Sequence, residues 1–115
     1  MKNIEEHLVE GHMKVTLWGG QDWFVIVDAK IDTGADRSSL DIALIEALEF
    51  LPARKSRKVR SANGVTTRDL YEVSIEWDSQ PHRLLVSGAD RSRMRYPMIL
   101  GREDFLDLCE MSEEE

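Results

Sequence analysis

The stretch Ala29-Lys30-Ile31-Asp32-Thr33-Gly34-Ala35-Asp36 decides how the rest of the chain is interpreted. The apolar run Trp23-Phe24-Val25-Ile26-Val27 precedes it and predicts a strand that delivers the carboxylate of Asp32 into a turn. Thr33 can hydrogen-bond locally, and Gly34 permits backbone angles that other residues avoid. These residue types therefore predict a tight turn that holds Asp32 rigidly at the mouth of a β-structure.

Length and composition favour one globular domain. The chain has 115 residues, of which 42% are hydrophobic and 32% charged, which is ordinary for a soluble protein. No apolar run approaches the length of a membrane span, and residues 1–7 lack the apolar region of a signal peptide. Cys109 is the one cysteine and cannot form an internal disulfide, so we expect a reducing, cytoplasmic setting and no membrane partner.

The net charge of −7 is distributed unevenly along the chain. Residues 1–53 carry 4 basic and 10 acidic side chains, residues 54–102 carry 11 and 5, and residues 103–115 carry none and 7. The basic middle favours a local anionic partner, whereas the overall acidity argues against general binding of nucleic acid. The alternative is a solvated surface with a disordered acidic end. We expect a polar N-terminal segment at 1–12, one domain at 13–110 and an acidic tail at 111–115.

Periodicity predicts a chain of short strands with two brief helices. The expected strands are Met13–Leu17, Trp23–Ile31, Ser56–Ala62, Val65–Trp77, Arg83–Ser87 and Tyr96–Leu100. The expected helices are Ile42–Leu51 and Arg102–Cys109. The apolar run of the second strand suggests burial on both faces, and a type I′ turn at Asn63-Gly64 joins the third and fourth strands. We therefore expect a small, mainly β barrel.

The first helix and the last strand complete this outline. The first helix carries an apolar stripe that we assign to the core, formed by Ala43, Leu44, Ala47, Leu48 and Leu51. Gly101 ends the last strand, and the arginine-rich loop 88–95 precedes it. We expect Trp18, Trp23 and Trp77 to pack in the core or at sheet edges, and Cys109 to be a small buried hydrophobe.

The run Tyr96-Pro97-Met98-Ile99-Leu100-Gly101-Arg102, well downstream of Asp-Thr-Gly-Ala, resembles the retropepsin-like aspartic proteases. The resemblance extends over roughly residues 28–106 and implies that the two elements pack together. It also implies a closed barrel with a flap, which is a β-hairpin between these two elements along the chain. The hairpin at Asn63 and Gly64 occupies that position in the sequence.

A closer resemblance is to a family labelled ATP-dependent zinc protease, which is associated with RimK-type glutamate ligases. Three segments carry it: Ala29 to Ala35, Gly64 with Arg68, and the run from Asp90 to Arg102. We take no cofactor from the label. Three scattered histidines and one cysteine offer no zinc-ligand spacing, and the chain has no glycine-rich phosphate loop for ATP.

The resemblance implies a water-activating pair of carboxylates that share one proton. Two ionised carboxylates at roughly 3 Å would repel by about 5–6 kcal/mol at an effective dielectric near 20, so only the singly protonated pair is stable near neutral pH. This chain has one Asp-Thr-Gly and no room for a second lobe. We therefore expect a homodimer in which Asp32 of each copy meets at the two-fold axis.

The resemblance also assigns roles to other residues. Thr33 and Gly34 belong to the catalytic turn with Asp32, and Ala35, Asp36, Gly101 and Arg102 support the active site and the dimer. Asp36 and Arg102 match positions that form an ion pair near the retropepsin interface; the alternative is that both are surface charges. The residues expected to form the flap or to contact substrate are Asn63, Gly64, Arg68, Arg91, Arg93 and Arg95.

Arg91, Arg93 and Arg95 alternate and could share one face, where with Arg68 they would suit an acidic or glutamylated substrate. The alternative is that a structural salt bridge holds Arg91 and the others are solvated. Two functions stay open at this point. One is an aspartic peptidase acting on a peptide or protein, and the other is a non-catalytic module that binds an acidic partner.

Overall fold

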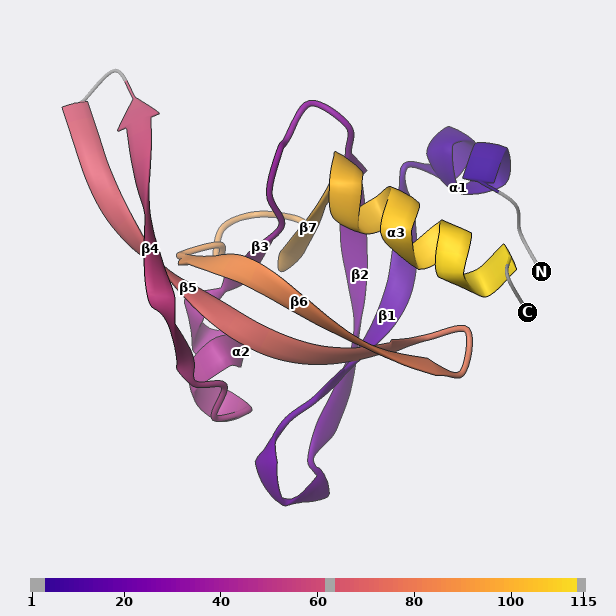
Figure 1. Cartoon of the computed structure of the whole chain (residues 1–115), viewed down its shortest axis with the longest axis horizontal. Coiled ribbons are helices and arrows are strands. Elements are labelled where there is room, and N and C mark those ends of the chain that lie inside the picture. The colour runs from indigo at the N-terminus through magenta and orange to yellow at the C-terminus, as the bar shows by residue number, and fades with distance from the viewer. Residues whose placement is uncertain (1–3, 62–63, 114–115) are drawn as a thin grey trace.

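Figure 1 shows the computed structural model, which describes residues 4–61 and 64–113, with side chains described for 5–53 and 69–110. Seven strands form one sheet: β1 (His12–Trp18), β2 (Phe24–Asp32), β3 (Ser39–Asp41), β4 (Pro52–Ser61), β5 (Gly64–Trp77), β6 (Gln80–Ala89) and β7 (Met98–Gly101). The helices are α1 (Ile4–Glu10), α2 (Ile42–Ala47) and α3 (Arg102–Glu113), with a short 3-10 turn, η1, at Gly20–Asp22.

Six of the strands close into a barrel. The sheet order is β1-β2-β7-β3-β6-β5-β4, and an additional pairing of β1 with β5 joins the ends of the first six. β4 pairs with β5 alone, so the β4–β5 hairpin projects from the barrel as an arm (Figure 1). The expectation of a small, closed, mainly β barrel with a central hairpin and short helices is confirmed.

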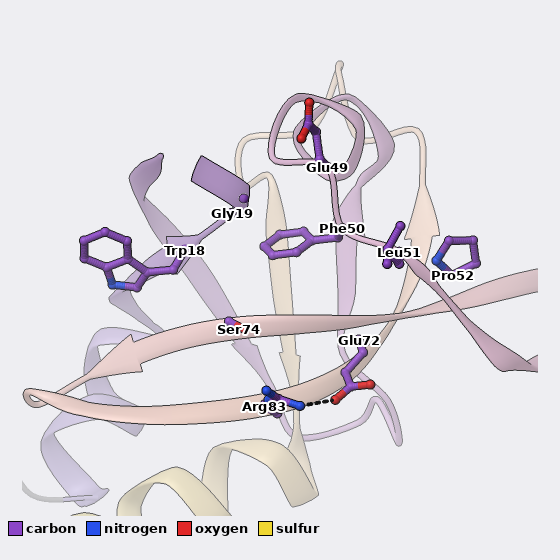
Figure 2. Close-up of a pocket in the computed structure, with 10 residues that line it drawn as sticks. Trp18, Gly19, Glu49, Phe50, Leu51, Pro52, Glu72, Ser74 and Arg83 are labelled. Carbon is purple, nitrogen blue, oxygen red and sulfur yellow. Dashed lines mark hydrogen bonds and ion pairs between the residues drawn. The ribbon is translucent and has the colours of Figure 1, made fainter. Parts of the chain in front are cut away.

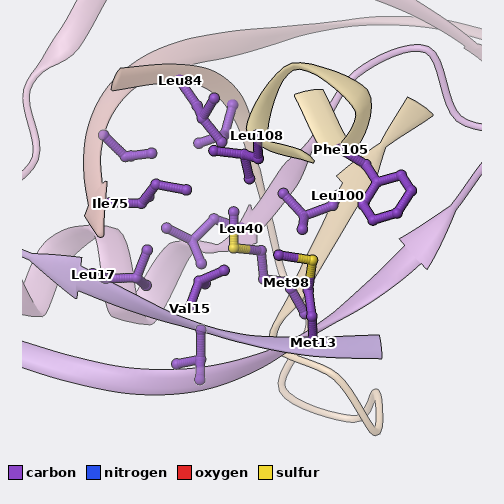
Figure 3. Packing of buried hydrophobic residues seen from close by; sticks show 14 of the residues in the cluster. Met13, Val15, Leu17, Leu40, Ile75, Leu84, Met98, Leu100, Phe105 and Leu108 are labelled. Atoms are coloured by element: carbon purple, nitrogen blue, oxygen red, sulfur yellow. The ribbon is translucent and has the colours of Figure 1, made fainter. Parts of the chain in front are cut away.

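The barrel interior holds one hydrophobic core (Figure 3). Val15 and Leu17 of β1, Val73 of β5 and Leu100 of β7 are at most 1% exposed. They alternate with outward residues, as the two-residue period of a strand requires. α3 packs against β7, β2 and β6 and contributes Phe105, Leu108 and Cys109, all buried. The expected burial of Cys109 is confirmed.

The expectation that the second strand is buried on both faces is wrong. Val27, Ala29 and Ile31 face the core, but Phe24 is 54% and Ile26 is 59% exposed. No second layer of the described chain covers the outer face of β2 at this height, so the outward half of the apolar run meets solvent. The apolar run here reflects the preference of these residues for a strand, not burial on both faces of the sheet.

The first helix is shorter than expected and buries a different face. The Asp41 side chain caps it by accepting a hydrogen bond from the Ala43 N–H (3.5 Å), and the helix ends at Ala47, well before Pro52. Glu49 then takes a left-handed φ of 59°. Because the chain turns there, Leu51 is 76% exposed and Ile45 is buried instead. Of the expected stripe, Leu48 is buried, Leu44 is half-buried, and Ala43 and Ala47 are exposed.

Other helix and strand boundaries also differ from the predicted ones. Ser61 pairs with Gly64 across the hairpin, so Gly64 begins β5 instead of serving as a turn residue; Asn63 lies outside the described residues. α1 and the three-residue strand β3 were not expected, and α3 continues to Glu113, past the expected start of the tail. The division into segments at residues 12 and 110 stays a prediction. Within the described part of the chain, no helix is long and apolar enough to cross a bilayer.

Candidate active site

Asp32 is the last residue of β2 and lies at a parallel pairing with β7, opposite Gly101. The chain turns immediately afterwards, and the Ala35 N–H donates to the Asp32 carbonyl (3.0 Å). The Gly34 N–H donates to Oδ1 of Asp32 (3.1 Å). The turn therefore holds one carboxylate oxygen through its own backbone and leaves the half-buried side chain accessible.

Gly34 contributes its small size rather than an unusual backbone angle. Its φ lies outside the left-handed region, which among described glycines only Gly11 occupies, at 81°. A Cβ on Gly34 would stand 3.4 Å from Oδ1 of Asp32, which is an ordinary van der Waals contact. The permissive φ expected at this position is thus not used within one copy, because a simple turn closed by Ala35 suffices.

Gly101 is required by close packing behind the turn. A Cβ there would lie 2.8 Å from the carbonyl carbon of Arg37 and 3.1 Å from the carbonyl oxygen of Ala35. The next residue, Arg102, donates its N–H to that same Ala35 oxygen (3.0 Å). The expected packing of the Leu-Gly-Arg run against the Asp-Thr-Gly-Ala turn is therefore present in the structure.

Ser38 links the two elements, and sequence reasoning missed it. Its side chain is fully buried; Oγ accepts from the Gly101 N–H (3.0 Å) and donates to Oδ2 of Asp104 (2.6 Å). Its carbonyl accepts from the Ser87 N–H (3.0 Å). One hydroxyl thus ties the loop after the turn to β7 and α3. A small hydroxyl residue after the turn was visible in the sequence, but its partners lie more than 60 residues away.

Asp36 and Arg102 are both exposed. Within the described side chains of a single copy, no ion pair joins them. Thr33 is also exposed beside Asp32, and the ion pair of Asp36 with Arg102 stays a prediction.

The arginine loop does not have the extended form that our expectation required. The Met94 N–H donates to the Arg91 carbonyl (2.9 Å), which makes a turn instead of an alternating strand. Nε of Arg91 donates to the Tyr96 carbonyl (2.9 Å), so this side chain closes the loop through a backbone oxygen instead of a salt bridge. Arg93 and Arg95 are exposed, and the guanidinium of Arg95 lies 5.5 Å from the centre of the Tyr96 ring.

Two further contacts fix this loop beside the turn. The Arg91 N–H donates to Oδ1 of Asp41 (3.2 Å). Ser92 donates both its hydroxyl (2.6 Å) and its N–H (3.0 Å) to Asp90, and these bonds lower the pKa of that carboxyl. Arg68 lies on β5 in the arm, opposite Arg57; its side chain is outside the described set.

A cavity of about 450 Å³ lies between the turn at Asp32 and the arginine loop. Gly34, Asp36 and Arg37 line one side, and Arg91 and Met94 line the other. A second cavity of about 450 Å³ lies away from the turn, between Trp18, Phe50 and the ion pair of Glu72 with Arg83 (3.2 Å; Figure 2). The first cavity adjoins the Asp32 turn through Gly34, but Asp32 itself is not among its lining residues. Within the described residues, no group of three or more His, Cys, Asp or Glu side chains could hold a metal ion.

Comparison with known proteins establishes the fold. No protein-family model and no curated protein matches the chain. Among solved structures, the EIAV protease complexed with the inhibitor HBY-793 shares 22% identity over 84% of this chain and 86% of its own, with a TM-score of 0.61. The simian foamy virus (mac) protease shares 14% over 84% and 93%, also at 0.61. A Legionella pneumophila protein of unknown function shares 23% over 85% of each chain, at 0.56. The chain therefore has a retropepsin-like fold; membership of the narrower ATP-dependent zinc protease family stays a prediction.

Proposed function

We propose that this retropepsin-like chain is an aspartic peptidase that works as a homodimer, with Asp32 of each copy supplying half of the catalytic pair. The observation that carries the proposal is the way in which the turn at Asp32 is held by hydrogen bonds and by packing. One carboxylate oxygen is held by the Gly34 N–H, Gly101 is in register beside it, and Ser38 ties the two elements together. Such rigidity favours a carboxylate that has to be positioned before reaction.

The chemistry follows from two such carboxylates at a two-fold axis. One ionised carboxylate removes a proton from water as it attacks the peptide carbonyl carbon, and the protonated partner donates to the carbonyl oxygen. The first carboxyl group then gives the proton it took from water to the leaving nitrogen as the C–N bond breaks, and the hydroxyl of the tetrahedral intermediate returns a proton to the partner carboxylate. A single copy holds one such group, because the chain contains one Asp-Thr-Gly. Activity therefore depends on association.

An acidic peptide is the substrate class that the surrounding charges favour. Arg93 and Arg95 stand exposed in the loop whose residues Arg91 and Met94 line the cavity beside the turn. Guanidinium groups bind carboxylates through paired hydrogen bonds. The resemblance to proteins associated with glutamate ligases points the same way, to glutamylated chains. The single buried Cys109 suits a reducing compartment such as the cytoplasm.

The test is peptide hydrolysis by the purified protein, using fluorogenic peptides that include an oligoglutamate, across pH 4 to 8. We expect Asp32→Asn to abolish cleavage. Asp28→Asn is the matched control, since Asp28 is a half-buried carboxylate on the same strand, outside the turn. Cleavage that persists in pure Asp32→Asn protein would overturn the mechanism.

The second candidate is a non-catalytic module that binds an acidic peptide or protein. The exposure of Arg93 and Arg95 beside a cavity favours it, since binding needs neither a second copy nor a proton-sharing pair. Oligoglutamate that binds to both wild-type and Asp32→Asn protein, with no cleavage by either, would select this function. Loss of that binding in an Arg93→Ala, Arg95→Ala double variant would locate the site.

A further inference from the structure

A cavity of about 500 Å³ lies between β6 and α3. Arg37, in the loop after the Asp32 turn, lines it and also lines the cavity beside that turn, whereas Asp32 lines neither. Leu84 of β6 and Leu108 of α3 lie side by side (Figure 3) and, with Leu85, form the apolar part of this cavity. Sites for small ligands commonly have about 300–1,000 Å³ and an apolar lining with a few polar groups. The cavity is therefore large enough for a small molecule.

The cavity holds one guanidinium that the chain leaves without a partner. Arg37 is half-buried, its Nε is buried without an acceptor, and no described side chain forms an ion pair with it. Arg83, the other arginine of the cavity, is paired with Glu72 (3.2 Å). His82 is uncharged near neutral pH because burial lowers its pKa. Buried donors nearly always have an acceptor in folded proteins, so Arg37 is the cation that an acceptor from outside the chain would satisfy.

Two carboxylates of α3 line the same cavity. Asp104 is half-buried and accepts from Ser38 through Oδ2 (2.6 Å), which leaves Oδ1 for another donor. Asp107, on the next turn of the helix, is exposed, and no described side chain forms an ion pair or hydrogen bond with it. Neither carboxylate forms an ion pair with Arg37, although all three groups line one cavity. Opposite charges therefore stand on the walls of this cavity without contacting each other.

We propose that this cavity binds a free α-amino acid with an aliphatic side chain. Arg37 receives the carboxylate through the paired hydrogen bonds that a guanidinium forms, Asp104 and Asp107 receive the ammonium group, and the leucines cover the side chain. An α-amino acid satisfies both signs of charge at once. A simple anion would be repelled by two carboxylates, and an amine would leave the Arg37 guanidinium unpaired, which is costly for a partly buried charge.

The residues of this site also pack against the loop after the Asp32 turn. A Cβ on Gly101 would lie 2.8 Å from the carbonyl carbon and 3.0 Å from the nitrogen of Arg37, so the backbone of Arg37 lies directly behind Gly101. Asp104 holds Ser38, which in turn accepts from the Gly101 N–H. The inference does not rest on the proposed function, because binding of an amino acid requires neither cleavage nor a second copy.

A series of three ligands tests the chemistry of the site. L-leucine carries both charges, isocaproate lacks the ammonium group, and isoamylamine lacks the carboxylate. Followed by methyl NMR of Leu84, Leu85 and Leu108, L-leucine should give saturable shifts with a dissociation constant of about 1 mM or lower. Each analogue should bind at least about tenfold more weakly, because one charged contact is lost. No saturable shift with L-leucine, or equal binding of isocaproate, would overturn the proposal.

Variants of the whole chain locate the ligand. Asp107→Asn and Arg37→Gln should each weaken L-leucine binding at least about tenfold. The matched controls are Glu103→Gln, an exposed carboxylate of α3 outside the cavity, and Arg95→Gln, an exposed arginine outside it; both should leave the constant unchanged. Because Asp107 is exposed, Asp107→Asn should keep the fold, so the test does not depend on the stability of Arg37→Gln. Asp32→Asn should bind L-leucine normally, whatever its effect on peptide cleavage.

The pattern of loss separates this site from the candidate active site. Binding that is lost in Asp32→Asn but retained in Asp107→Asn would place the amino acid beside the Asp32 turn and contradict the proposal. Binding that is unchanged in both Asp107→Asn and Arg37→Gln would contradict it as well. Peptide cleavage lost in Asp32→Asn reports separately on the proposed function.

Discussion

The Ser38 hydroxyl offers the sharpest test of how the candidate active site is held. Ser38→Ala removes the acceptor of the buried Gly101 N–H and the donor to Asp104. An unsatisfied buried N–H costs about 1–3 kcal/mol, and a hydrogen bond to a charged group contributes about 1.5–3 kcal/mol. Asp104 is half-buried, so water replaces part of the second contribution. We expect a loss of about 3 kcal/mol in the free energy of unfolding.

Urea unfolding at pH 7, followed by tryptophan fluorescence, measures this loss. The midpoint should fall with the slope unchanged, and the melting temperature should drop by about 12 °C for a domain of this size. Ser39→Ala is the matched control, because Ser39 is a half-buried neighbour on β3 whose hydroxyl has no hydrogen-bond partner among the described residues. The free energy of unfolding of Ser39→Ala should lie within about 0.5 kcal/mol of the wild-type value.

Asp104→Asn adds a further check. The amide retains an oxygen that can accept from Ser38, so this variant should lose less stability than Ser38→Ala. If Ser38→Ala unfolds within about 0.5 kcal/mol of the wild type, the hydroxyl does not join the turn to β7 as the distances imply. The same result would remove the structural reason for a rigid Asp32.

Three other outcomes follow from contacts around the site. Gly101→Ala should destabilise the fold by about 3 kcal/mol or more in the same urea assay, since its Cβ would meet backbone atoms of Arg37 at 2.8 Å. Gly34→Ala should change stability by less than about 1 kcal/mol. A larger loss for Gly34→Ala than for Gly101→Ala would contradict the packing behind the turn. Burial lowers the pKa of His82 from its ordinary 6.5, so the unfolded chain binds more protons than the folded one and stability should fall as pH drops below about 6.5. In a plot of melting temperature against pH, His82→Gln should reduce this fall. An unchanged fall would exclude His82 as its source. Arg91→Ala should reduce stability by about 1 kcal/mol through loss of its bond to the Tyr96 carbonyl, while Arg93→Ala should leave thermal unfolding unchanged; equal losses would show that Arg91 is not the structural arginine.

The sequence predicted those parts of the fold that rest on local chemistry. Asp-Thr-Gly-Ala after a β-branched run and Leu-Gly-Arg before a helix indicated the turn, the strand beside it and the barrel. On β5, Val73 and Ile75 are buried on either side of the exposed Ser74, as a two-residue period requires, whereas the buried Leu70 lies out of that phase. A two-residue period identifies a strand's buried face once one side meets a core.

Features that depend on distant partners could not be obtained in this way. Ser38 is one of several hydroxyl residues in its segment, and only the closed fold brings it to Gly101 and Asp104. The outer face of β2 looks buried in the sequence because its residues are apolar, although nothing in the described chain covers it. The arginine loop alternates in sequence but folds as a turn, because Arg91 binds a carbonyl within the same loop.

Closure of the barrel has a consequence for how the chain folds. The seam between β1 and β5 joins Thr16, Leu17 and Trp18 to Ser74, Ile75 and Glu76, and the Trp18 indole N–H donates to Glu76 across it (2.8 Å). Nearly sixty residues separate the two sides of this seam. Contacts of such long range slow folding, since the loop must close before they stabilise anything. During synthesis on the ribosome, β1 and β2 emerge long before β5, so a nascent chain exposes apolar strand edges until the seam forms.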